Sequence, residues 1–177
     1  ADDAVFVTYL TNLINAVYTR FEADFWQPGK FTRCSAAELR HYIQSSEIAV
    51  AWRRGSSHAD PADVMGCVRL HMQVDDDGGS IGACGMLVCD PSFQGTGVGR
   101  ALVEFVEERA RAQGAKQMQV EVIVGDGWVH EFKERLAAWY ERRGYRLLRT
   151  AEVRDDLPWL ADILAKKAKV RVFRKRL

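Results

Sequence analysis

The sequence lacks the features that assign a chain to several large classes of protein. Only four cysteines occur in 177 residues, none of them in a CxxC pair, and the four histidines form no HExxH motif. This pattern argues against a disulfide framework and against a metal site. No apolar run approaches the roughly 20 residues needed to cross a bilayer, and no signal peptide is recognisable. We therefore expect a cytoplasmic protein with reduced thiols and no membrane association.

An excess of charge of one sign is also missing. Hydrophobic residues make up 47% of the chain and charged residues 28%, yet the net charge is only +1. These values are typical of a globular protein and do not favour a nucleic-acid partner. A basic run near the C-terminus is the exception, and we interpret it as a solvated edge strand rather than a nucleic-acid site. It comprises Lys166, Lys167, Lys169, Arg171, Arg174, Lys175 and Arg176.

Hydrophobic periodicity divides the chain into helices and strands. Helices are expected at 5–24, 35–43, 97–113, 131–143 and 155–167. Strands are expected at 47–53, 64–74, 80–89, 116–124, 145–153 and 169–175. Ser35 followed by Glu38 predicts a capping box. We expect a loop at 54–63 and a hairpin turn at 75–79.

The order of these elements predicts the fold class. Three consecutive strands followed by alternating helices and strands indicate an α/β fold, in which helices flank a central mixed sheet of about six to seven strands. The nearly continuous apolar run at 120–124 is typical of a central strand covered on both faces. For a chain of 177 residues, we expect one domain that spans 1–177.

A glycine-rich loop lies between the strand that ends near Cys89 and the helix that begins near Gly97. The loop is Gln94-Gly95-Thr96-Gly97-Val98-Gly99-Arg100. Backbone N–H groups at the start of a helix have no partner within the helix, and the helix dipole adds partial positive charge there. Glycines let a phosphate approach that backbone closely. The loop therefore predicts an anion site, most simply one for phosphate.

The spacing within the loop excludes two common phosphate loops. A Walker loop needs Gly-Lys-Ser/Thr, whereas this loop continues as Gly99-Arg100-Ala101. A dinucleotide fingerprint starting at Gly95 and Gly97 needs its last glycine where Arg100 stands. A nucleotide-binding or redox protein is therefore a weak alternative.

The segment 86–102 resembles the most diagnostic segment of the GNAT superfamily of N-acetyltransferases, because Gln94-x-x-Gly97-x-Gly99 fits the Q/R-x-x-G-x-G/A signature. The segment 139–145 is similar to a later motif of that family, and the resemblance covers roughly 46–150. It implies acetyl-CoA as cosubstrate, with its pyrophosphate on the loop and its pantetheine arm along strand 85–89. The implied cofactor contacts are Met86, Leu87, Val88, Gln94, Gly95, Thr96, Gly97, Val98, Gly99 and Arg100.

Two side chains are candidates for the proton transfers of acetyl transfer to an amine. Tyr140 matches the acid tyrosine of the family, and a phenol of pKa ~10 can protonate a thiolate whose thiol has a pKa of ~8.5. Glu121 stands in an apolar strand, where desolvation raises the pKa of a carboxyl toward that of a general base. The alternatives are a core tyrosine and a surface glutamate, and a water chain that ends at Glu121 or His130 could also remove the proton.

Other assignments stay open at the level of the sequence. Lys133 stands where a related branch has an asparagine thought to touch the cofactor, so it is either a cofactor contact or a solvated lysine. Cys84 and Cys89 suggest an acetyl-cysteine route, but direct transfer is favoured because nothing near them in sequence lowers a thiol pKa. The acceptor is a primary amine of a small molecule or peptide, and Phe21 to Trp26, Trp128 and Trp159 are candidates for its pocket. A CoA-binding regulatory module is the alternative function, and a homodimer is left open.

Overall fold

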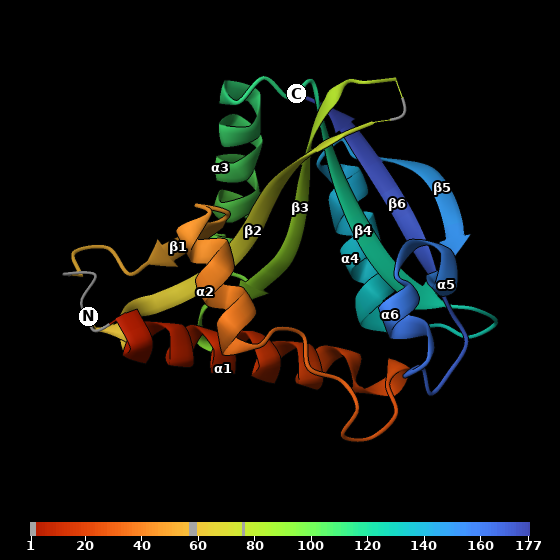
Figure 1. The fold of residues 1–177 in the computed structure, drawn as a ribbon, viewed down its shortest axis with the longest axis horizontal. Helices are drawn as coiled ribbons and strands as arrows, with labels where there is room; N and C mark the ends of the chain where they lie inside the picture. The colour runs from red at the N-terminus through yellow and green to blue at the C-terminus, as the bar shows by residue number, and fades with distance from the viewer. Residues whose placement is uncertain (1–2, 57–59, 76) are drawn as a thin grey trace.

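A six-stranded sheet forms the centre of the computed structural model, which describes residues 3–56, 60–75 and 77–177 (Figure 1). The strand order is β1-β2-β3-β4-β6-β5, with β3 parallel to β4 and all other neighbours antiparallel. The expected α/β fold with a mixed sheet is confirmed. The strands are β1 (Ile48–Trp52), β2 (Val64–Val74), β3 (Ser80–Cys89), β4 (Gln117–Gly125), β5 (Arg146–Glu152) and β6 (Ala168–Arg176).

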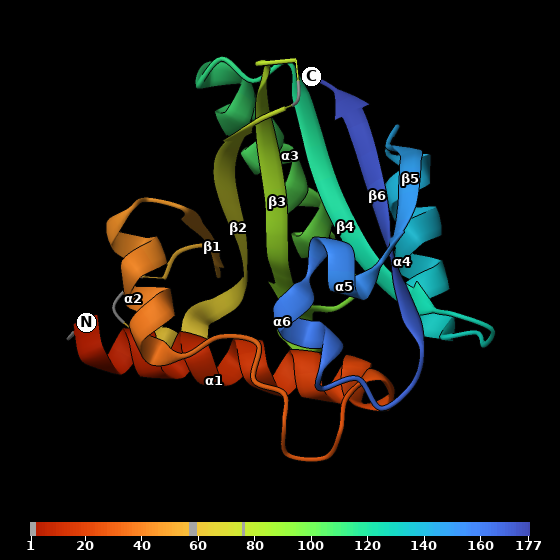
Figure 2. The same ribbon diagram turned by 45° about the vertical axis from the view of Figure 1, so that its right-hand side comes forward.

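Helices cover both faces of this sheet (Figures 1 and 2). Two of them, α3 and α4, lie behind it, whereas α2, α5 and α6 lie in front, and α1 crosses the ends of β2 and β3. The helices are α1 (Asp3–Glu22), α2 (Ala36–Gln44), α3 (Val98–Ala112), α4 (Glu131–Arg142), α5 (Val153–Asp156) and α6 (Pro158–Ala161), with short 3-10 turns η1 (Ala23–Phe25), η2 (Pro61–Asp63) and η3 (Pro91–Phe93).

Local sequence signals account for several of these boundaries. The capping box at α2 is present, because the N–H of Glu38 donates to Ser35 Oγ and the N–H of Ser35 donates to Glu38 Oε2. The hairpin between β2 and β3 is confirmed by their antiparallel pairing, although Asp76 lies outside the described residues. Residues 57–59 of the expected loop also lie outside them.

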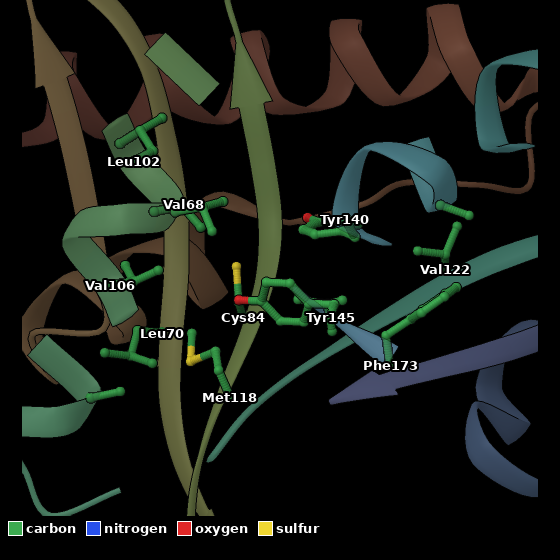
Figure 3. Packing of buried hydrophobic residues seen from close by; sticks show 14 of the residues in the cluster. Val68, Leu70, Cys84, Leu102, Val106, Met118, Val122, Tyr140, Tyr145 and Phe173 are labelled. Carbon is green, nitrogen blue, oxygen red and sulfur yellow. The ribbon is translucent and has the colours of Figure 1, made fainter. Parts of the chain in front are cut away.

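The main core lies between the sheet and the pair α3 and α4. Figure 3 shows Leu102 and Val106 of α3 above Val68 and Leu70 of β2, with Met118 of β4 nearby. These side chains are at most 4% exposed, so together they fix α3 against the centre of the sheet. The start of α3, where the glycine loop ends, is thereby held at one end of β3.

The parallel pair β3 and β4 separates part-way along its length. Pairing runs from Ile81↔Gln117 to Cys84↔Val120 and then stops. Beyond Cys84, β3 carries a bulge against β2 at Met86, whose φ is +50°. Figures 1 and 2 show the two strands diverging toward α1. We call this opening the fork; backbone groups of β3 that would pair with β4 are left without that partner.

Two expectations about the C-terminal third were wrong. The single helix expected at 155–167 is replaced by two short helices, because Leu157 precedes Pro158 and takes a non-helical φ of −133° and ψ of 60°. The basic run does not form an edge strand: β6 lies between β4 and β5. Its cations instead pair with acids such as Glu107, Glu134 and Asp126 on neighbouring elements.

The final strand pairings also settle the position of β4. It pairs with β3 on one side and with β6 on the other, so the expectation of a central strand at 116–124 is confirmed. None of the described helices combines the length and the apolar character that crossing a bilayer requires.

Candidate active site

The glycine loop turns sharply between η3 and α3. The N–H of Ser92 donates to Asp90 Oδ1 (2.8 Å), and Thr96 Oγ1 donates to the carbonyl of Phe93 (2.7 Å). Gly95 and Gly97 have φ values of +78° and +94°, which side chains rarely allow. These turns bring the chain to the start of α3, where the first N–H groups have no partner within the helix. The loop therefore has the backbone of an anion site.

A cavity of about 630 Å³ begins at this loop and extends past the fork. Its walls come from the second half of α1, the segment 26–33, β3 after Ala83, β4 at Glu121 and Ile123, α4, and α6 with the residue before it. Most of the lining is apolar, and its aromatic members include Phe21 and Phe132, which stack at 4.4 Å. An elongated cavity that joins an anion site to an unpaired strand edge suits a ligand with a phosphate head and a narrow arm.

Most of the residues expected to contact a cofactor line this cavity, and some do not. Those that line it are Met86, Leu87, Gln94, Gly95, Gly97, Gly99, Arg100 and Lys133. Val88, Thr96 and Val98 are absent from the lining: Val88 and Val98 bury their side chains in the core, and the Thr96 hydroxyl is used within the loop. The side chains of Val88 and Val98 are therefore not available to a ligand in this cavity, so contacts at these two positions would use the backbone.

Tyr140 lies on α4 and reaches toward the fork. Figure 3 shows its side chain extending from α4 toward β3, and the residue lines the cavity although only 5% of it is exposed. Its hydroxyl donates no hydrogen bond to any described residue. Burial, with the neighbouring Cys84 as a further cause, raises the pKa of Tyr140 well above its ordinary value. The phenol therefore stays protonated near neutral pH and has its proton free for a ligand.

Tyr145, which follows Gly144, has a different environment. Its side chain is 1% exposed, packs edge-on against Tyr140, and donates from its hydroxyl to Glu107 Oε1 (2.9 Å). Because this hydroxyl is already used inside the core, Tyr145 is a packing residue and Tyr140 is the tyrosine that faces the cavity.

Glu121 projects from β4 on the opposite side of the fork. Val120 and Val122 point into the core, so Glu121 points to the other face, where it is exposed to the cavity. Gln119 Nε2 donates to its Oε1 (3.1 Å). Partial burial by the surrounding walls raises the pKa of Glu121, and Asp156 adds to the effect. This carboxylate can accept a proton at neutral pH and lies at the open end of the fork.

Lys133 is a buried residue, which excludes the alternative of a solvated lysine. Its Nζ pairs with Glu22 Oε1 at the end of α1, and the two side chains are 7% and 5% exposed. The pair ties α4 to α1 across the cavity and both residues line it. In this structure the Lys133 ammonium neutralises the Glu22 carboxylate.

A family model described as an acetyltransferase (GNAT) domain matches residues 44–147, which is more than half of the chain. The chain belongs to the GNAT family. The GNAT match includes the glycine loop, the fork and Tyr140, and it excludes the whole of α1 and of α6, which also line the cavity.

The chain is also similar to individual known proteins, in sequence to one and in fold to others. The protein YxbD of Bacillus subtilis (strain 168), described as uncharacterized, is 31% identical over 88 residues, which is 45% of this chain and 51% of that protein; the match thus spans about half of the relative. The NatC complex bound to Gag peptide and CoA gives a TM-score of 0.67 at 17% identity, covering 100% of this chain and 92% of that chain. A ribosomal-protein-alanine N-acetyltransferase from Brucella melitensis gives 0.67 at 12% identity, covering 98% and 96%. The two solved structures show a shared fold.

A second cavity, of about 530 Å³, meets the first at the fork. The two share Tyr18, Arg33, Glu121 and the start of the free part of β3. The wall of the second cavity is more polar than that of the first, and Arg69, His71, Gln73 and Gln119 also contribute to it. Sequence reasoning missed Tyr18, Arg33, Arg69 and His71, because no local motif marks them and only the fold brings α1, the segment before α2, and β2 together.

The aromatic residues expected at an acceptor pocket divide into two groups. Phe21, Trp26 and Trp159 line the first cavity, and Trp159, which is 57% exposed, also lines the second. Trp128 lines neither: its ring packs against Phe25, and a Cβ on Gly125 would lie 2.8 Å from that ring. Phe25 is fully buried, so it and Trp128 are structural.

The cysteines near the fork are poor nucleophiles. Burial raises the pKa of Cys84 to about 12 and also raises the pKa of Cys89. A thiol must ionise to attack an acyl group, and these environments oppose ionisation. In the described residues, no group of three or more potential ligands could hold a metal ion.

Proposed function

We propose that this chain transfers the acetyl group of acetyl-CoA directly to the amine of a small molecule or peptide. The observation that carries the proposal is the fork. It connects the glycine loop to a point between the free phenol of Tyr140 and the carboxylate of Glu121. Family membership and the CoA in a structural relative support the same cosubstrate.

The residues around the cavity fit acetyl-CoA in three parts. The backbone of Gly95 to Arg100 suits the pyrophosphate. The unpaired edge of β3 at Met86 and Leu87 suits the amides of the pantetheine arm, which would pair with it as a further strand. The apolar walls from α1 and α4 exclude water from the thioester end. When bound, acetyl-CoA supplies an activated acetyl group.

Glu121 and Tyr140 account for the proton transfers. Glu121 takes one proton from the acceptor ammonium, so that its nitrogen has a lone pair. As the new C–N bond forms and the C–S bond breaks, Tyr140 donates its proton to the departing sulfur. The phenolate of Tyr140 then recovers the second proton from the new amide nitrogen, and Glu121 releases its proton to solvent. The net products are the amide, CoA thiol and one proton.

Ligand titration combined with a thiol-release assay tests the proposal. We expect acetyl-CoA to bind in calorimetry while NAD and ATP do not, and CoA thiol to be released only when an amine is added. Binding of acetyl-CoA without release across a broad panel of amines would favour a CoA-binding regulatory module. Failure of acetyl-CoA to bind would contradict the proposal altogether.

A further inference from the structure

The second cavity contains two guanidinium groups that differ in how they are held. Arg69 is already engaged: its Nε donates to Glu47 Oε2 (2.7 Å), and its Cζ lies 3.7 Å from the ring centroid of Tyr42. Because both its charge and its planar face have partners, Arg69 shapes the wall of the cavity rather than offering a free binding group.

Arg33, by contrast, forms no ion pair with any carboxylate in the described residues. Its guanidinium lies against Tyr18, with Cζ 5.1 Å from the ring centroid. It also lies over the fork, since a Cβ on Gly85 would be 3.9 Å from its Nη2. The residue lines both cavities at the place where they meet. A guanidinium in this position can donate two parallel hydrogen bonds to a planar anion.

The backbone at Arg33 is fixed, which makes the position of this charge reproducible. Asn15 of α1 accepts hydrogen bonds at Oδ1 from the N–H of Arg33 (2.9 Å) and of Cys34 (3.1 Å). Its Nδ2 donates to the carbonyl of Cys34 (2.8 Å). One amide side chain thus anchors the segment before α2 to α1. Because the backbone at Arg33 is already ordered in the folded protein, ligand binding does not have to order it at a further cost in conformational entropy.

Two of the carboxylates near this cavity already have polar partners. Glu38 is held by the backbone N–H and the hydroxyl of Ser35 in the capping box. The Glu22 carboxylate attracts the Arg33 guanidinium electrostatically, but its ion-pair partner is Lys133. Glu121 is left as the acid that faces the fork. Among the described residues, the wall thus combines the Glu121 carboxylate with an Arg33 guanidinium that contacts Tyr18 but has no carboxylate within ion-pair distance, an arrangement that matches a ligand with an ammonium and an anion close together.

We propose that the acceptor is a small amine that carries a carboxylate next to the amine, as an α-amino acid does, and that Arg33 binds this carboxylate. The assignment rests on the proposed acetyl transfer and adds the class of its acceptor. With the carboxylate held by Arg33 beside Gly85, the amine of the same molecule lies at the fork, between Glu121 and the thioester end of the first cavity. The proton and bond changes are those given above.

Matched acceptor pairs test this inference. CoA release would be measured for the twenty amino acids, for their carboxamides, for spermidine, and for short peptides with amidated C-termini. The acid and its carboxamide share an α-amine and a side chain and differ in the negative charge. We expect at least one amino acid to exceed its carboxamide about 10- to 100-fold in kcat/KM, the range for a hydrogen-bonded charged group. The amine pKa differs within each pair, so rates would be compared at equal concentrations of free amine.

Three variants separate the role of Arg33 from general effects. Arg33→Met should lower kcat/KM for the amino acid about 10- to 100-fold and leave that for the carboxamide nearly unchanged. Arg33→Lys should retain part of the preference, since it keeps the charge but loses the planar fork. Arg40→Met removes an exposed arginine of α2 that lines neither cavity, and it should change neither value. Thermal melting and acetyl-CoA affinity would verify that each variant is folded.

The outcomes distinguish the two proposals. Equal or faster acetylation of carboxamides, spermidine or amidated peptides would overturn the amino-carboxylate assignment and leave the acetyltransferase proposal intact. The amino-carboxylate assignment would also be overturned if acetyl-CoA binds and other amines are acetylated but no amino acid is. If Arg33→Met does not fold, the wild-type ratio of acid to carboxamide still decides. Failure of wild-type protein to bind acetyl-CoA would instead contradict the proposed function.

Discussion

The two cavities that meet at the fork are built in opposite ways. The first takes its anion site from seven consecutive residues, 94–100, and its wall is mostly apolar. The second takes its polar groups from α1, the segment before α2, β2 and β4, which are distant in sequence. The anion site of the first cavity is thus specified by a short segment that lies within the GNAT match, whereas the polar groups of the second cavity come together only in the folded chain. The cosubstrate is accordingly the easier half of the reaction to infer, and the acceptor the harder.

Removing the Tyr140 hydroxyl should have the largest effect, because we propose that this hydroxyl, which faces the first cavity, protonates the leaving sulfur. Tyr140→Phe keeps the buried ring and removes the proton donor. We expect kcat to fall about 10²- to 10⁴-fold, the usual range for general acid catalysis, with little change in acetyl-CoA affinity. Steady-state kinetics and calorimetry measure the two quantities. Tyr145→Phe is the matched control, and it should alter stability rather than the chemical step, since its hydroxyl bonds Glu107. Unchanged turnover in Tyr140→Phe would remove its assigned role.

Breaking the buried pair between Lys133 and Glu22 should come next in size. Lys133→Met leaves the Glu22 carboxylate buried without its partner, which typically costs about 3–5 kcal/mol of folding free energy. Urea denaturation of the single variant and of the double variant Lys133→Met, Glu22→Leu checks this. The double variant should recover most of the loss, because an apolar pair leaves no uncompensated charge. Equal free energies of unfolding for the single and double variants would show that leaving Glu22 unpaired carries no penalty, and would contradict the prediction.

The parts of the site that sequence reasoning predicted are those with a local signal. The loop at 94–100 combines glycine spacing with a helix start, and Tyr140 stands directly before a basic-glycine-aromatic turn. Both signals lie within a few residues, so neither needs the fold. The strand at Glu121 was equally clear from its apolar run, but the sequence left open whether the carboxylate is a base or a surface group, and only the structure places it on the face opposite Val120 and Val122.

The parts that were missed or misjudged depend on long-range contacts. Arg33 looks like any surface arginine until Asn15 fixes its backbone against α1. The prediction of an edge strand for the basic run is wrong because strand order depends on long-range pairing, and β6 inserts between β4 and β5. The helix expected at 155–167 is different, because its break at Leu157-Pro158 is itself a local signal, which hydrophobic periodicity outweighed.

The second cavity can be probed through the pH dependence of turnover. Burial raises the pKa of Glu121, so its ability to accept a proton should be lost as pH falls through a value above the ordinary range of a glutamate. We expect Glu121→Gln to lower kcat/KM about tenfold or more at neutral pH and to remove that part of the acid limb, leaving the titration of the acceptor amine.

The effect of the Glu121 carboxyl on stability has the opposite pH dependence. A raised carboxyl pKa means that the folded state binds the proton more tightly, so the stability contributed is present at low pH and lost as pH rises. Glu121→Gln should therefore melt no lower than wild type at neutral pH, and an unchanged acid limb would assign the base elsewhere.

The first cavity offers the smallest predicted effect and the closest control. Gly97 and Gly114 stand at opposite ends of α3 with φ values of +94° and +90°, and a Cβ on either would meet nothing within 4 Å. Replacing each with valine should cost similar stability, roughly 1–2 kcal/mol for a left-handed backbone. Only Gly97 lines the cavity, so only Gly97→Val should weaken acetyl-CoA binding, by about tenfold, because the turned loop and its N–H groups would shift. Thermal melting measures the shared cost and calorimetry the specific one. If both variants lost acetyl-CoA affinity equally, the loss would come from destabilising α3 as a whole. That result would contradict the assignment of the loop at 94–100 as the local binding site for the cosubstrate.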